Sequence, residues 1–235
     1  MRTNGWTIGL AGSWVFLLCA IGSAGAEGAK TSYPAMAPLA QYQEASPADE
    51  IALARSAAPP SISADADVLT LGAEGYHTAV KGKNGFVCIV SRSWGAAFSD
   101  PVFWNPKIRA GICYNPAGAR SVLPAYLERT RWVLAGVSTA DMIARIKAEI
   151  AAKTYVLPEP GAMCFMLSKQ QRFADGGHWH PHLMFFIAHV DGAAWGADLP
   201  GSPIYASAGD PDPVTTFMVP VTKWSDGTPA AMEMH

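Results

Sequence analysis

Two consecutive helices in the middle of the chain, with strands before and after them, limit the folds that this sequence can adopt. The first helix is expected over residues 117–135, interrupted at Pro124, which lacks the backbone N–H that a helix interior needs, and ending at Gly136. The second begins with Ser138-Thr139-Ala140-Asp141, in which serine and aspartate have the spacing of a capping box. A helical pair placed between strands is typical of an α+β domain.

Strand-like apolar runs surround this pair. Residues 76–81 and 86–94 predict a hairpin, because Asn84-Gly85 between them tolerates the positive φ of a tight turn. Three further strands are expected after the helices, at 162–169, 180–190 and 215–223, and shorter extended pieces at 67–71, 108–114 and 204–206. The element order ββααβββ predicts a single α+β domain, with an antiparallel sheet of about five strands and two or three helices on one face. This order is similar to that of PAS-like and profilin-like sensor folds, a similarity that no sequence motif carries.

The N-terminus has the features of a secretory signal. Arg2 precedes an apolar stretch over residues 6–21, and Ala24-Gly25-Ala26 fits the small-residue cleavage pattern. We therefore expect a signal peptide over residues 1–26 and a periplasmic or secreted mature protein. A lipid anchor on Cys19 is the alternative, which Leu18 before it disfavours. Residues 27–66 are expected to form a flexible leader and a short helix, and residues 67–235 the α+β domain.

Composition and charge exclude several classes of partner. The 235 residues are 50% hydrophobic and 15% charged, which favours a sizeable core over a disordered chain. The formal net charge of −2 becomes −3 when the single Arg2 leaves with the signal peptide. Because no basic run exists, nucleic acid and anionic membrane surfaces are poor partners. We expect no integral membrane span in the mature chain, and an unknown small molecule as the partner.

Three cysteines remain in the mature chain, so they form at most one internal disulfide. Cys88 and Cys164 lie in apolar, strand-like runs, where a free cysteine behaves as a small buried hydrophobe. An oxidising compartment would permit one bond between neighbouring strands, and the sequence leaves the pairing among Cys88, Cys113 and Cys164 open.

The strongest chemical signal is the run His178-Trp179-His180-Pro181-His182. Imidazole is the commonest protein ligand of transition metals, and alternate side chains of a strand point to the same face. Cα atoms two residues apart lie about 6.6 Å apart on a strand, and those four apart about 13 Å. A metal–nitrogen bond of about 2.0 to 2.1 Å therefore favours a pair that includes His180 over all three rings. The predicted ligands are His178, His180 and His182, and the predicted metal is zinc, copper or iron.

Pro181 complicates this interpretation, because proline belongs at a strand start, at a sheet edge or at a bulge. Further ligands must come from other segments, and nothing in the sequence chooses among the candidates: Glu74, His77, Glu159, Asp175 and the tail Met232-Glu233-Met234-His235. The alternative is that these histidines only bond to backbone carbonyls or face solvent.

In the phrases Phe103-Trp104-Asn105-Pro106 and His178-Trp179-His180-Pro181-His182, the mature segment resembles exported bacterial proteins of unassigned function. The resemblance implies export and one domain, and it brings no activity. The motifs H-E-x-x-H, G-x-S-x-G, the P-loop and G-x-G-x-x-G are absent from the sequence.

Three functions remain open from the sequence. The first is metal binding at the histidine segment, with a metal-dependent hydrolase as its extension and Glu74 or Asp175 as the base. The second is a non-catalytic periplasmic small-ligand-binding or sensor-like module, in which the histidines orient a small polar ligand. It predicts an enclosed pocket between sheet and helices. The third is a structural or partner-binding envelope protein, which predicts a large exposed apolar patch.

Overall fold

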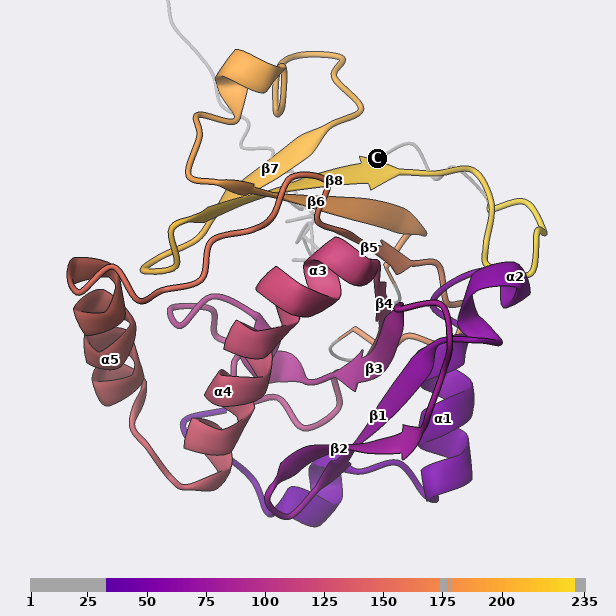
Figure 1. Ribbon diagram of the computed structural model, residues 1–235, viewed down its shortest axis with the longest axis horizontal. Helices are drawn as coiled ribbons and strands as arrows, with labels where there is room; N and C mark the ends of the chain where they lie inside the picture. The colour runs from indigo at the N-terminus through magenta and orange to yellow at the C-terminus, as the bar shows by residue number, and fades with distance from the viewer. Residues whose placement is uncertain (1–32, 174–176, 178, 231–235) are drawn as a thin grey trace, which may run out of the picture. The chain divides into compact units, whose positions relative to one another are not determined.

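The computed structural model describes residues 33–173, 177 and 179–230. Eight strands in this part of the chain form one mixed sheet (Figure 1). The spatial order is β2-β1-β3-β4-β5-β6-β8-β7, and every neighbouring pair is antiparallel except β1 and β3. The strands are β1 (Asp67–Gly72), β2 (Gly75–Val80), β3 (Val87–Ser91), β4 (Ala110–Tyr114), β5 (Met163–Met166), β6 (His182–Ala188), β7 (Tyr205–Ala208) and β8 (Val214–Pro220). The expected α+β domain is confirmed, but the expected sheet of about five strands is too small.

The helices begin where the capping patterns predict. Asp49 N donates to Ser46 Oγ at 3.2 Å, and Asp141 N donates to Ser138 Oγ at 3.1 Å. The expected break in the first central helix falls at Val122, so that proline occupies the first turn of the next helix, where its missing N–H costs nothing. The α-helices are α1 (Pro47–Arg55), α2 (Pro60–Ser63), α3 (Pro116–Ser121), α4 (Leu123–Leu134) and α5 (Thr139–Ala151), and the 3₁₀ turns are η1 (Leu39–Tyr42), η2 (Ser93–Gly95) and η3 (Ala193–Trp195).

Helices cover both faces of the sheet, which corrects the expectation of a single covered face. In β3, Cys88 and Val90 pack in one buried cluster with Leu53 of α1, whereas Ile89 packs in a second cluster with Leu123 of α4. Because successive strand residues point to opposite faces, α1 and α4 lie on opposite sides of the sheet (Figure 1).

The predicted hairpin between residues 76–81 and 86–94 is wrong, because β1 lies between β2 and β3. Asn84-Gly85 does turn the chain, with Gly85 at the expected positive φ of 76°, but the side chain of Asn84 also makes a long-range bond: its Nδ2 donates to Ile62 O at 2.7 Å. Its Oδ1 accepts from Phe86 N at 3.0 Å, and Asp67 N donates to Phe86 O at 2.9 Å. The chain therefore wraps around the start of β1 and places β3 parallel to it.

Part of the expected leader packs into the domain. Tyr42 of η1 is fully buried, with its ring 5.0 Å from that of Trp94 and its hydroxyl donating to Trp104 O at 2.7 Å. The buried Arg109 donates to Gln41 O at 2.8 Å, and so binds the same segment to the loop before β4. The stretch around η1 therefore belongs to the core.

The expected signal peptide, residues 1–26, lies outside the described residues. Among the helices that the structure does describe, none combines the length and the apolar character that crossing a bilayer requires.

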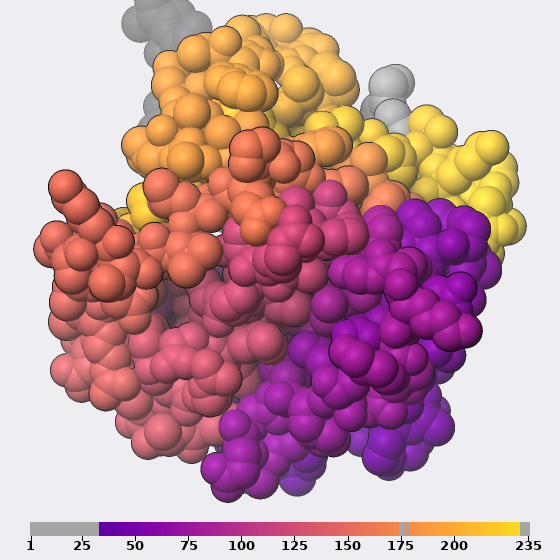
Figure 2. Space-filling view, viewed as in Figure 1, coloured from indigo at the N-terminus to yellow at the C-terminus, as the bar shows by residue number. Residues whose placement is uncertain are grey.

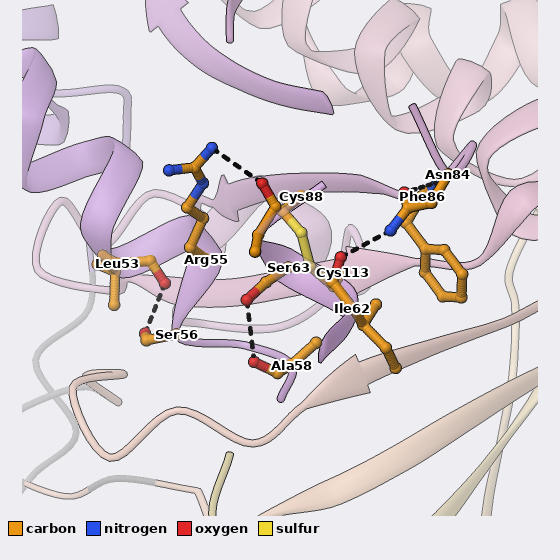
Figure 3. The surroundings of a disulfide bond; sticks show 11 residues. Leu53, Arg55, Ser56, Ala58, Ile62, Ser63, Asn84, Phe86, Cys88 and Cys113 are labelled. Atoms are coloured by element: carbon orange, nitrogen blue, oxygen red, sulfur yellow. Dashed lines mark hydrogen bonds between the residues drawn. A yellow bond between two sulfur atoms is a disulfide. The ribbon is translucent and has the colours of Figure 1, made fainter. Parts of the chain in front are cut away.

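Cys88 and Cys113 form a disulfide between directly opposed positions of β3 and β4 (Figure 3). Both sulfurs are buried beneath α1 and α2, where Ser56 Oγ donates to Leu53 O and Ser63 Oγ donates to Ala58 O. The third cysteine, Cys164 of β5, is free and buried. A buried cross-strand disulfide is consistent with an oxidising, extracytoplasmic location.

Candidate functional site

Two of the three clustered histidines, His180 and His182, belong to the described residues, and His178 lies outside them. His180 Nε2 donates to Val221 O at 3.0 Å, and His182 Nδ1 donates to His180 O at 2.7 Å. Since a carbonyl oxygen only accepts, these bonds require a proton on Nε2 of His180 and on Nδ1 of His182, which selects one tautomer whenever the ring is neutral. The lone pairs then lie on Nδ1 of His180 and Nε2 of His182.

Pro181 directly precedes β6, so the proline does lie at a strand start, one of the three positions expected for it. His182 is 8% exposed, and this burial is the main reason why its pKa is lowered. The neutral imidazole that burial favours is also the form that coordinates metals.

The three candidate ligands that belong to the described residues, Glu74, His77 and Glu159, do not join this pair. Glu74 and His77 belong to the β1–β2 hairpin, and β3, β4 and β5 separate that hairpin from β6 in the sheet. Glu159 accepts from Arg120 at 2.6 Å in an exposed ion pair. Within residues 33–173, 177 and 179–230, no three His, Cys, Asp or Glu side chains come together as a metal site. The remaining candidates lie outside the described residues: Asp175 and Met232-Glu233-Met234-His235.

A cleft of about 450 Å³ lies on the face of the sheet that α4 covers. Strands β4, β6 and β8 supply its floor with apolar side chains, and the rim comes from the β7–β8 connection, the segment after α5 and the region of η2. Figure 2 shows the surface recessed between the segment that follows α5 and helices α3 and α4. The floor residues are Ile112, Tyr114, Met184, Phe186, Val214, Thr216 and Met218.

One face of α4 forms the wall opposite this floor. From this side the cleft is lined by Val122, the cap residue before α4, and by Ala125, Tyr126 and Arg129 of α4, whose spacing of i, i+3, i+4 and i+7 places them on one side of the helix. The polar groups of Tyr126 and Arg129 bond to different partners.

An ion pair joins three distant segments at the rim of the cleft. Arg129 Nη2 donates to Asp212 Oδ2 at 2.5 Å, and the Tyr155 hydroxyl donates to Asp212 Oδ1 at 3.0 Å. The Arg129 guanidinium also lies over the Phe98 ring, 4.4 Å from its centroid. Burial, followed by the charge of Asp212, raises the pKa of Tyr155, so this hydroxyl keeps its proton at neutral pH.

A buried polar network lies behind Tyr126. Its hydroxyl accepts from Arg92 N at 2.7 Å and lies 3.3 Å from the hydroxyl of Tyr76, which donates to Val90 O. Arg92 in turn donates to Glu50 Oε1 at 2.9 Å, and both charged side chains are almost fully buried. The network fixes the position of Tyr126 and connects α1 to the cleft through the sheet.

No family model, curated protein or solved structure matches this chain. The cleft residues were not among the site residues that the sequence predicts. The one local signal for the cleft is the helical spacing of residues 122, 125, 126 and 129. Because these side chains are small or polar, they do not form the apolar stripe by which a buried helix face is recognised. The Arg129–Asp212 pair spans 83 residues and leaves no local pattern.

Proposed function

We propose that this chain is an exported protein that binds a small, largely apolar ligand in the cleft between the sheet and α4. The observation that carries the proposal is the cleft itself, whose volume of about 450 Å³ falls within the range of about 300–1,000 Å³ for small-molecule sites. Its floor is apolar, and a few polar groups converge at its rim, which is the usual composition of such sites.

Binding without catalysis fits two serine hydroxyls of the cleft. Ser91 Oγ donates to Arg92 O and Ser121 Oγ donates to Ala117 O, so both serines serve the fold. The N-terminal sequence and the Cys88–Cys113 disulfide support export. A sensor-like role, a PAS-like or profilin-like arrangement, and membership in an exported bacterial family of unassigned function belong to the same proposal.

The test is binding of the uncharged dye Nile red, followed by its fluorescence. Ala125→Trp places an indole inside the cleft, and Ala148→Trp makes the same change at an exposed position of α5. We expect wild type and Ala148→Trp to bind the dye equally, and Ala125→Trp to lose at least about tenfold in affinity. Equal binding by Ala125→Trp, or none by the wild type, would contradict the proposal.

A second candidate function is metal binding at His180 and His182. The supporting observation is that each ring donates one N–H to a backbone carbonyl, as metal-ligating histidines commonly do. His178, the third predicted ligand, would complete the site. When bound, zinc, copper or iron would supply an activated water for hydrolysis, with Asp175 as the base, since Glu74 lies across the sheet.

Elemental analysis of tag-free mature protein tests this candidate. We expect bound metal in the wild type and in His77→Ala, the matched control on β2, and its loss in His180→Ala. Metal-free wild type, or equal metal in all three proteins, would exclude the site.

A further inference from the structure

We propose that the ligand of the cleft carries a positively charged group, such as an amine, at one end of its apolar body. This inference rests on the proposed binding function and deepens it by naming the class of ligand. It follows from the charges that the cleft presents and from how each of them is engaged.

Four charged side chains line the cleft: Asp100, Arg129, Asp210 and Asp212. The single cation of this lining is already paired within the protein. Arg129 donates to Asp212 and, at 3.3 Å each, to the carbonyls of Trp94 and Ala96, and it packs on a phenyl ring. Three of its five N–H donors therefore have acceptors in the protein, and its charge cancels that of Asp212.

The other two carboxylates are not neutralised. Asp100 Oδ1 accepts from Val102 N at 2.9 Å, and its carboxylate forms no ion pair with a described residue. Asp210 is exposed, and no side chain or backbone group in the described part of the chain bonds to its carboxylate. Carboxylates are ionised at neutral pH, so the cleft carries two uncompensated negative charges.

These charges lie at the rim and the apolar surface lies below them. Asp210 lies in the β7–β8 connection, which also supplies Gly209 to the cleft, directly after Ala208 at the end of β7. Asp100 closes the turn in which its N–H donates to Ala97 O, another residue of the lining. A ligand with its apolar body on the floor would thus place its polar end beside the carboxylates. The excess of negative charge at the rim favours a positively charged end of the ligand there.

Three probes of equal length test the inference: 4-phenylbutylamine, 4-phenylbutanol and 4-phenylbutyrate, with affinities from calorimetric titration at pH 7. We expect the amine to bind about tenfold more tightly than the carboxylate, with the alcohol between them. Asp210→Asn should reduce the preference for the amine over the alcohol. Asp65→Asn, the same change at an exposed position outside the cleft, should leave it unaltered.

The outcomes separate the two proposals. Equal or tighter binding of 4-phenylbutyrate overturns the cationic ligand and leaves the cleft as a binding site. An unchanged amine preference in both Asp210→Asn and the double variant Asp100→Asn/Asp210→Asn also overturns it. If no probe binds the wild type, or if Ala125→Trp binds all three as well as the wild type, the proposed function itself fails.

Discussion

The Cys88–Cys113 disulfide is expected to be one of the largest single contributions to stability. It closes a loop of 25 residues, and the chain-entropy relation gives about 3.5 kcal/mol for a loop of that length at 25 °C. Replacing both cysteines by alanine also removes two fully buried sulfur atoms, at about 1 kcal/mol each. Cys88→Ala/Cys113→Ala should therefore lose about 4 to 6 kcal/mol of unfolding free energy.

Equilibrium unfolding in urea, followed by tryptophan fluorescence, measures this loss, and the buried Trp94 makes the signal sensitive to core opening. Cys164→Ala is the matched control, because it removes a buried thiol that forms no disulfide, and it should lose about 1 kcal/mol. If the double variant loses no more than twice the loss of Cys164→Ala, the cross-link contributes nothing and the reasoning fails.

For three further substitutions, the structure determines the direction of the change in stability. Glu50→Gln keeps the shape of the acceptor for Arg92 but leaves that buried charge unpaired, so urea unfolding should show a loss of about 3 to 5 kcal/mol, and a loss below 1 kcal/mol would contradict burial of the pair. Asp212→Asn removes the carboxylate to which both Arg129 and Tyr155 donate, and thermal unfolding should show a loss of about 1 to 3 kcal/mol in unfolding free energy. An unchanged stability would show that these bonds do not form in solution. Burial lowers the pKa of His182 below its unfolded value of about 6.5, so its contribution to stability is complete above that pH and is lost as pH falls through the lower folded value. His182→Asn, whose amide can still donate to the same carbonyl, should reduce the fall in unfolding free energy between pH 8 and pH 5. An equal fall in this variant and the wild type would mean that other groups cause the loss of stability in acid.

Local signals in the sequence predicted the local structure. Ser46 and Ser138 cap their helices as expected, because each bond joins residues three apart and needs nothing from the rest of the fold. The strand positions followed in the same way, whereas Pro181 had three possible positions and only the fold selects the strand start. The hairpin failed because Asn84 bonds to Ile62, 22 residues away, and a turn pattern contains no information about that partner.

The site depended on long-range contacts, and so the sequence did not reveal it. Arg129, Tyr155 and Asp212 come from α4, from the segment after α5 and from the β7–β8 connection, and each of them alone resembles an ordinary surface residue. The histidine segment is the most conspicuous chemical pattern in the sequence because its chemistry is concentrated in five residues. A cleft is a property of packing between distant elements, and only the fold brings its lining together.

Ligand binding in the cleft is tested most directly by the methyl resonances of ¹³C-labelled methionine during titration with 4-phenylbutylamine. Met184 and Met218 lie on the floor of the cleft, whereas Met142 is fully buried in a separate cluster between α5 and η2. We predict saturable shifts of the Met184 and Met218 resonances, with that of Met142 unchanged. Saturation binding without a shift at Met184 or Met218 would contradict the proposed site.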